Sequence, residues 1–298
     1  MGRSLEKRLR AALGVAVFVA SLTGDVRRTP AQTVYRSGVD LVFVTATVVD
    51  RDGRFVAGLS ADDFVVSEEG RPQTIVSFTA NRVPVSLGIA LDVSGSMTPP
   101  QIEAARAAIR RLVNDLLGVD DELFFAVFER RTTMLREWTT DRELFGRALD
   151  GARVGGTTAL YDAVRRLLPV AESGRHDKKA LLVVSDGDDR ASRISQRDLQ
   201  RSVRASNVLV YALGVDGGEG INARNLRRFT DDTGGRTEVI NGFKNLDAAT
   251  ARLADELNRQ YQLAYLMPGT RDGRWHPIKV EVRRRGVVVR ARAGYVRQ

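Results

Sequence analysis

From residue 85 onward, short apolar runs alternate with segments of helical period, and this alternation limits the possible fold more than any other feature. Runs of strand length lie at residues 85–90, 123–128, 181–185, 208–214 and 237–240. Helical patterns lie at residues 102–116, 160–168, 195–205, 222–232 and 246–260. Strands that alternate with helices form a mostly parallel sheet with helices on both faces. We therefore expect a doubly wound α/β domain over residues 85–260, with residues 132–138 as a short antiparallel edge strand.

Strand patterns also occupy both ends of the chain. Residues 34–84 show alternating apolar positions and turn signals without a helical period, and residues 261–298 return to the same pattern. Three strands with one uncovered face do not make a stable domain. We therefore expect the segments 32–84 and 261–298 to form one small β-sandwich into which the α/β domain is inserted.

The apolar run at residues 85–90 leads into the sequence Leu91-Asp92-Val93-Ser94-Gly95-Ser96-Met97. This places one carboxylate and two hydroxyls on a tight turn at the carboxyl edge of the sheet, where open α/β sheets bind ligands. A hard cation such as Mg²⁺ takes oxygen ligands of these kinds. The loop is therefore a candidate metal site.

These residues resemble the metal-ion-dependent adhesion site of the von Willebrand factor type A family. That family combines Asp-x-Ser-x-Ser on a first loop with a Thr on a second and an Asp on a third. Residues 155–162 read Gly-Gly-Thr-Thr-Ala-Leu-Tyr-Asp, and the family phrase aligns best on Thr158, with Thr157 as the alternative. Residues 181–187 provide the third motif, a strand that ends in Asp186.

The resemblance implies a ligand set and a function. Ser94, Ser96 and Thr158 would be inner ligands, while Asp92 and Asp186 would carry charge, acting through water or holding the hydroxyls. The implied metal is Mg²⁺, with Mn²⁺ as a possible substitute, and the implied partner is a protein that offers a Glu or Asp carboxylate. The expected activity is metal-bridged protein binding in adhesion or complex assembly, without bond breaking.

The flanking segments extend this resemblance. The phrase Leu59-Ser60-Ala61-Asp62-Asp63-Phe64 and the phrase Tyr261-Gln262-Leu263-Ala264-Tyr265 are similar to phrases in bacterial exported proteins that carry a von Willebrand factor type A-related domain. The resemblance thus covers nearly the whole chain after residue 31.

The first 31 residues have the composition of a secretory signal. Residues 1–10 carry four basic side chains, and residues 11–22 are an apolar run too short to span a bilayer. A cut after Ala31 would release a mature protein without a membrane span, whereas an uncleaved segment would act as an N-terminal anchor. We predict an exported protein that is periplasmic, held at the cell surface or extracellular.

Composition excludes several other classes. The chain has no cysteine, which excludes disulfides, a thiol nucleophile, a zinc-thiolate site and a lipid-modified N-terminal cysteine. The net charge is +9, but residues 1–31 hold six Lys or Arg and two Asp or Glu, so the rest carries +5. These basic residues are scattered and form no aromatic-interleaved stripe, so we predict no nucleic-acid binding.

Other interpretations of the motifs remain open. Asp92 and the serines are also good helix caps, and Asp186 fits an ordinary acidic turn. An aspartate-nucleophile phosphohydrolase would use Asp92, but such enzymes commonly carry a second acid where this chain has Ser94. A structural envelope protein with a relic metal site is the third possibility. The only histidines, His176 and His276, are interpreted as loop or surface residues, and no enzyme is predicted.

Overall fold

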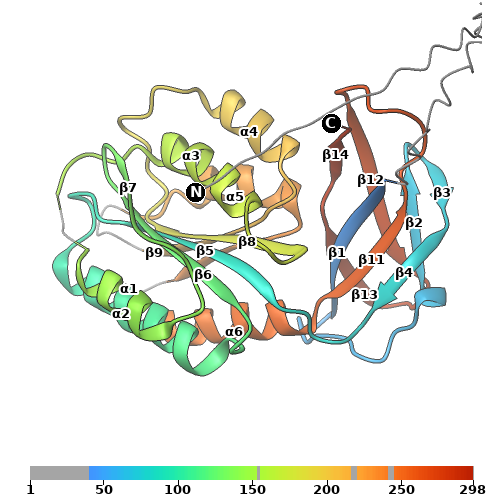
Figure 1. Cartoon of the computed structure of the whole chain (residues 1–298), viewed down its shortest axis with the longest axis horizontal. Coiled ribbons are helices and arrows are strands. Elements are labelled where there is room, and N and C mark those ends of the chain that lie inside the picture. Colours follow the sequence, from blue (N-terminus) through green and yellow to red (C-terminus); the bar gives the residue numbers. More distant parts are fainter. Residues whose placement is uncertain (1–39, 153–154, 216–219, 241–244, 298) are drawn as a thin grey trace, which may run out of the picture. The chain divides into compact units, whose positions relative to one another are not determined.

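Figure 1 shows the computed structural model of the protein, which describes residues 40–152, 155–215, 220–240 and 245–297. These residues belong to one compact unit. The predicted signal or anchor segment, residues 1–31, lies outside the described residues. Within the described ranges, every helix is too short or too polar to cross a membrane.

A six-stranded sheet in the order β10-β9-β8-β5-β6-β7 forms the centre of the α/β part. Its strands are β5 (Val85–Asp92), β6 (Glu122–Phe128), β7 (Thr132–Thr139), β8 (Lys178–Ser185), β9 (Leu209–Val215) and β10 (Thr237–Ile240). All neighbours are parallel except β7, which pairs antiparallel with β6. Every residue of β5, β6 and β9 is buried, as expected when helices cover both faces. The predicted parallel sheet and its antiparallel edge strand are confirmed.

Among the described residues, six helices cover the two faces of this sheet. They are α1 (Pro99–Arg111), α2 (Arg142–Asp150), α3 (Leu160–Glu172), α4 (Gln196–Ala205), α5 (Ala223–Thr230) and α6 (Leu246–Arg259). Figure 1 shows α1, α2 and α6 on one face and α3, α4 and α5 on the other. Successive residues of β5 point to opposite faces, so Leu91 belongs to the first core and Ala90 to the second.

The sequence patterns do not predict helix α2. The helix begins after Asp141, whose carboxylate accepts hydrogen bonds from the backbone N–H groups of Glu143 (2.8 Å) and Leu144 (3.0 Å). Phe145 and Leu149 are its buried residues. Two apolar positions in nine residues give too weak a period to predict a helix without knowledge of its cap.

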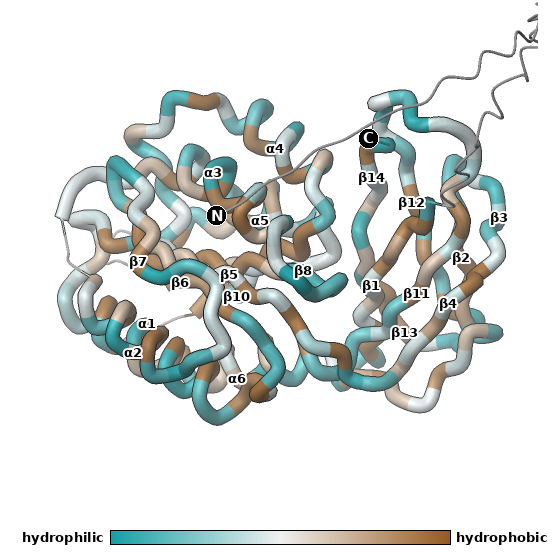
Figure 2. Tube along the Cα trace, viewed as in Figure 1, coloured by the Kyte–Doolittle hydropathy of each residue, from teal (hydrophilic) through white to brown (hydrophobic). Residues whose placement is uncertain are grey.

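Two antiparallel four-stranded sheets form the remaining part, in the orders β13-β1-β11-β4 and β14-β12-β2-β3. Their strands are β1 (Leu41–Asp50), β2 (Phe64–Glu68), β3 (Arg71–Gln73), β4 (Ile75–Thr79), β11 (Tyr261–Leu266), β12 (Trp275–Val282), β13 (Val287–Ala291) and β14 (Gly294–Val296). A third core, which includes Val44, Phe64 and Tyr265, lies between them. Figure 2 shows hydrophobic residues along the strands and hydrophilic residues in many of the connecting turns. The prediction of a β-sandwich built from both chain ends is confirmed.

The prediction that His276 is a loop or surface residue is wrong. His276 lies in β12, and 3% of its side chain is exposed. Its Nδ1 lies 3.0 Å from a carboxylate oxygen of Glu69, and its Nε2 lies 3.0 Å from one of Asp272. Strand alternation places His276 on the same face as Ile278, which is also buried. The imidazole ring therefore lies between carboxylates in the interior of the protein instead of at the surface.

A buried polar cluster joins the α/β part to the sandwich. Its centre is Glu256 of α6, which is fully buried. Glu256 Oε1 accepts hydrogen bonds from the hydroxyls of Thr47 in β1 (3.3 Å) and Tyr211 in β9 (3.1 Å), and from Arg290 in β13. Its Oε2 lies 3.2 Å from Nε of Arg236. The cluster therefore connects the last helix with two strands of the sandwich.

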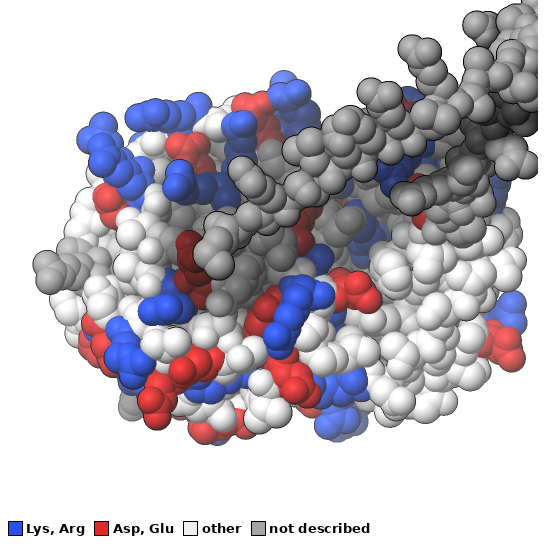
Figure 3. All heavy atoms as spheres, viewed as in Figure 1, with Lys and Arg blue, Asp and Glu red and all other residues white. Residues whose placement is uncertain are grey.

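Surface charges of both signs are interspersed. On the face drawn in Figure 3, Lys and Arg side chains alternate with Asp and Glu. Many charged side chains of the described residues form ion pairs, such as Arg204 with Asp232 and Arg252 with Glu238. This face carries no single-sign stripe of the kind that nucleic-acid binding requires. The absence of nucleic-acid binding stays a prediction.

Candidate metal site

The three predicted loops meet at the carboxyl edge of the central sheet. Strands β5 and β8 are neighbours with Leu91 opposite Val184, so Asp92 at the end of β5 and Asp186 directly after β8 lie on adjacent strands. The threonine loop precedes α3 and packs against the first loop through two backbone bonds. Gly155 N–H donates to Val93 O (2.9 Å), and Gly95 N–H donates to Gly156 O (2.9 Å). All three loops therefore lie where an α/β sheet binds its ligands.

Three hydroxyls contact one another at this edge. Thr158 Oγ1 donates to Ser94 Oγ at 2.8 Å, and Ser94 Oγ lies 3.1 Å from Ser96 Oγ. Ser94 and Thr158 are buried, whereas Ser96 is half-buried. The hydroxyl cluster is therefore open to the surface on the side of Ser96.

The structure distinguishes between the two adjacent threonines. Thr158 reaches Ser94, while Thr157 is exposed. The preceding Gly156 has a φ of 83°, a left-handed conformation that favours glycine. A side chain at this position would also meet the carboxylate of Glu129. This turn directs the Thr158 hydroxyl into the cluster.

Asp92 is held rigidly at the base of the site. It is fully buried; its Oδ1 accepts a hydrogen bond from Ser94 N–H (2.9 Å), and its Oδ2 accepts one from Ser185 Oγ (2.7 Å). Burial raises the pKa of Asp92 to about 6, the bonds from Ser94 and Ser185 oppose this shift, and the negative charge of Asp186 adds to it. The charge of Asp186 therefore acts on the Asp92 carboxylate.

Asp186 is also buried, and its Oδ1 accepts a hydrogen bond from Asp188 N–H (2.9 Å). Its backbone O accepts one from Asn222 N–H (2.8 Å), which anchors the third loop to the start of α5. Neither Asp92 nor Asp186 forms an ion pair with a basic side chain of the described residues. Asp92 and Asp186 thus have no cationic side-chain partner among the described residues, while Arg190 on the third loop pairs with Asp188.

Sequence reasoning missed the role of Ser185. Its hydroxyl donates to Asp92 and accepts a hydrogen bond from Gly187 N–H (3.0 Å), so it links the first and third loops. The sequence does contain a feature that indicates this role, because Ser185 ends a buried strand directly before Asp186.

The donor set fits a hard cation. The structure gathers three hydroxyls and two carboxylates, all oxygen donors, from three loops. Within the described ranges, no cluster of three or more His, Cys, Asp or Glu side chains has the arrangement of a metal site. A cation at this edge would therefore depend on the serine and threonine hydroxyls.

Comparison with known proteins assigns the family. Residues 87–252, more than half of the chain, match the von Willebrand factor type A domain. The chain therefore belongs to the von Willebrand factor type A domain family. No curated protein sequence matches it.

Several solved structures have a similar fold. A von Willebrand factor type A protein from Catenulispora acidiphila is 15% identical, with a TM-score of 0.51 over 88% of this chain and 75% of that one. Proximal thread matrix protein 1 from the mussel byssus is 15% identical, with a TM-score of 0.53 over 64% and 51%. The corresponding domain of the pili tip protein Mfa5 from Porphyromonas gingivalis is 11% identical, with a TM-score of 0.50 over 59% and 96%. At these identities the likeness shows the fold alone.

Proposed function

We propose that this protein binds a partner protein through Mg²⁺ held at the loop edge of the α/β part, with Mn²⁺ as a possible substitute. The observation that carries the proposal is the contact of three hydroxyls beside two buried carboxylates that have no basic partner among the described residues. Burying this negative charge without a cation is costly, and a metal ion would remove the cost. The biological role would be adhesion or complex assembly.

Each residue has a separate task in this proposal. The hydroxyls of Ser94, Ser96 and Thr158 would be direct ligands, while Asp92 and Asp186 would balance the charge of the ion. Asp92 also holds the first loop in shape through Ser94 N–H. Neutral hydroxyls leave much of the positive charge of the ion uncompensated. When bound, the metal would supply a positive centre that accepts a Glu or Asp carboxylate of the partner.

We further propose that the protein is exported and acts in the periplasm, at the cell surface or outside the cell. The basic start and the short apolar run of residues 1–31 support this proposal. An exported location would expose the metal-binding edge to envelope or extracellular proteins, which fits adhesion or assembly.

Capture of partners with and without chelator tests the proposed function. The immobilised full chain is incubated with a cell-envelope extract in Mg²⁺, in EDTA, and in EDTA followed by restored Mg²⁺. We expect a captured protein that EDTA releases, that restored Mg²⁺ recovers, and that the Asp186→Ala variant does not retain. The same proteins captured in all three conditions would contradict metal-bridged binding and would favour binding elsewhere on the protein.

The raised pKa of Asp92 predicts a pH dependence. Below about pH 6 a proton competes with the cation for this carboxylate, so the affinity for Mg²⁺ should fall about tenfold per pH unit. In the metal-free protein, the stability that protonated Asp92 confers is present below about pH 4 and is lost as the pH rises to about 6. Metal binding offsets that loss at higher pH.

Calorimetric titrations with Mg²⁺ between about pH 5 and 8 measure this dependence. Above about pH 6 the affinity should level off. The matched variant Asp92→Asn should bind more weakly at every pH and should lose the slope. If the affinity of the wild type for Mg²⁺ stays constant down to pH 5, the charge of Asp92 does not contribute to metal binding.

A further inference from the structure

Strand β1 has two halves with different surroundings. In the second half, Ala46 lies opposite Ala291 of β13, and this pairing continues to the end of β1. Strand β13 stops at Ala291, and the chain then turns into β14, which belongs to the other sheet. In the first half, residues 41–45, β11 pairs along one edge, and no described strand pairs along the other.

The backbone groups of this free edge can be assigned from the ladder. Asp40 O accepts a hydrogen bond from Met267 N–H (2.8 Å), and bonded residues alternate along an antiparallel strand. The even-numbered residues of this segment therefore bond to β11. The N–H and C=O groups of Leu41 and Phe43 point to the opposite edge, whereas those of Thr45 face Arg292, the residue that follows β13. An edge of this kind is a template for another strand.

Leu41, Phe43 and Thr45 line a cavity of about 430 Å³. Its other wall includes residues 203–209, which run from the end of α4 to the start of β9. Leu41 and Phe43 are 41% and 48% exposed, so the edge presents apolar side chains as well as backbone groups. A volume of this size lies within the range of ligand sites. The free edge thus faces a recess rather than a packed interior.

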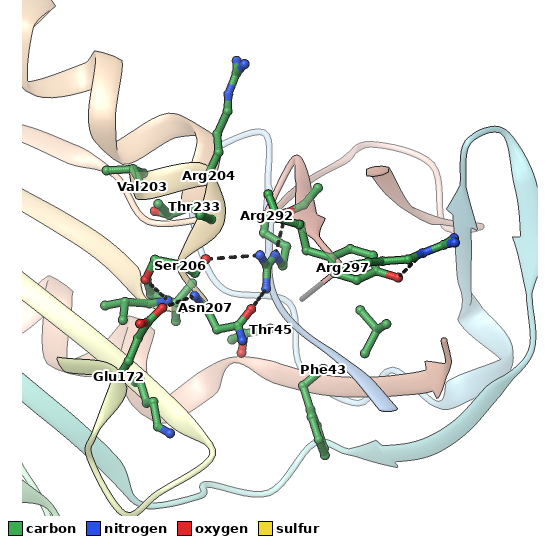
Figure 4. Close-up of a pocket in the computed structure, with 18 of the residues that line it drawn as sticks. Phe43, Thr45, Glu172, Val203, Arg204, Ser206, Asn207, Thr233, Arg292 and Arg297 are labelled. Carbon is green, nitrogen blue, oxygen red and sulfur yellow. Dashed lines mark hydrogen bonds between the residues drawn. The ribbon is translucent and has the colours of Figure 1, made fainter. Parts of the chain in front are cut away.

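Arg292 directly follows β13 and lies beside the boundary between the two halves of β1. Its Nε donates to Gly294 O (2.7 Å), its Nη1 to Asn207 Oδ1 (2.5 Å) and its Nη2 to Ser206 O (3.2 Å). Figure 4 shows the guanidinium group in the middle of the cavity lining, with dashed bonds to Ser206 and Asn207. All three acceptors are neutral. Burial lowers the pKa of Arg292 to about 10, so it is charged at neutral pH.

The other arginines of the cavity each have a carboxylate partner. These pairs are Arg204 with Asp232, Arg271 with Asp40, and Arg297 with Glu68. Arg292 has no carboxylate within ion-pair distance among the described residues; the charge of Glu172 acts on it from farther away. A half-buried guanidinium without a carboxylate partner favours an incoming carboxylate.

We propose that the free edge of β1 at residues 41–45 accepts an extended segment of a partner protein as an added strand, and that Arg292 binds an Asp or Glu side chain of that segment. Backbone bonds to Leu41 and Phe43 supply affinity, and the contact with Arg292 supplies specificity. The acidic residue lies at the end of the segment beside Thr45. This site shares no residue with the metal site and does not depend on the proposed function.

Selection of peptides against the full chain tests this site. The probe is a phage-displayed library of random dodecapeptides, offered in EDTA so that the metal site cannot contribute. We expect enrichment of peptides that carry an acidic residue beside β-branched or aromatic residues. Enriched peptides are synthesised, and their affinities are measured by fluorescence anisotropy.

Three variants separate the contacts. Phe43→Pro removes one edge N–H that β11 does not use, and Arg292→Gln removes the charge; each should weaken binding about tenfold or more. Arg271→Gln is the matched control, because it removes a cavity arginine that already has a carboxylate partner, and it should change the affinity less than about twofold. Thermal unfolding checks that each variant folds. A peptide with its acidic residue changed to the amide tests the Arg292 contact on wild type alone.

Three results would overturn the proposal. They are a library without enrichment in EDTA, equal binding by wild type and the two site variants, and retention of affinity by the amide peptide. Light scattering adds a fourth. If the wild type dimerises and Phe43→Pro is monomeric, the edge is occupied by a second copy of the chain rather than by a partner.

Discussion

Replacing Glu256 by alanine should lower the free energy of unfolding by about 3 kcal/mol. The carboxylate is fully buried and accepts hydrogen bonds from Thr47 and Tyr211 while it pairs with Arg290 and Arg236. Its removal leaves two guanidinium groups and two hydroxyls without this partner. The side chains of Arg290 and Arg236 are 29% and 31% exposed, so water can solvate part of the charge that the substitution leaves unpaired. The expected loss therefore lies at the low end of the range for a buried ion pair.

Urea denaturation of Glu256→Ala and Asp255→Ala measures this effect with a matched control. Asp255 is the adjacent residue on the same helix, but its pair with Arg259 is exposed. An exposed pair of this kind contributes about 0.3 to 0.5 kcal/mol, so Asp255→Ala should lie close to wild type. Equal losses in the two variants would show that the cluster around Glu256 does not stabilise the connection between the α/β part and the sandwich.

The fold could be predicted from the sequence wherever burial was continuous or strictly alternating. Most positions of the run that becomes β5 are apolar, and the structure buries all of it between two layers of helices. That the two chain ends form one β-sandwich could also be predicted, because neither end holds enough strands to cover its own apolar face. Strand pairing such as Val44 with Leu263 then brings the ends together.

Features that depend on contacts between distant residues could not be predicted. Glu256 and Thr47 are far apart in the sequence, and no local pattern signals that they meet. His276 lies between Trp275 and Pro277, which suggested a loop or surface position, yet the alternation of β12 buries it beside carboxylates. Helix α2 is likewise defined by the cap at Asp141 more than by its apolar period.

Much of the candidate site could be predicted, because motifs at the ends of parallel strands must meet at one edge of the sheet. Ser94, Ser96 and Thr158 were proposed as ligands from their motifs, and their hydroxyls are in contact. Two details required coordinates. One is the position of Thr158 rather than Thr157 in the cluster, and the other is the support that Ser185 gives to Asp92.

The adjacent threonines provide the sharpest test of the proposed ligand set. Thr158→Ala removes the buried hydroxyl that donates to Ser94, whereas Thr157→Ala removes an exposed one. If Thr158 is a direct ligand, its loss should weaken Mg²⁺ binding about 100-fold, because even groups that only support metal ligands contribute 10- to 100-fold. Thr157→Ala should change the affinity less than about twofold.

Calorimetric titration of Mg²⁺ into the full chain at neutral pH, with these two variants alongside, therefore tests the central claim most directly. The account predicts binding of one ion to wild type and to Thr157→Ala, and a loss of affinity of about 100-fold in Thr158→Ala. Folded wild type that binds no Mg²⁺, or equal weakening in the two threonine variants, would contradict the proposal that these loops hold a metal ion.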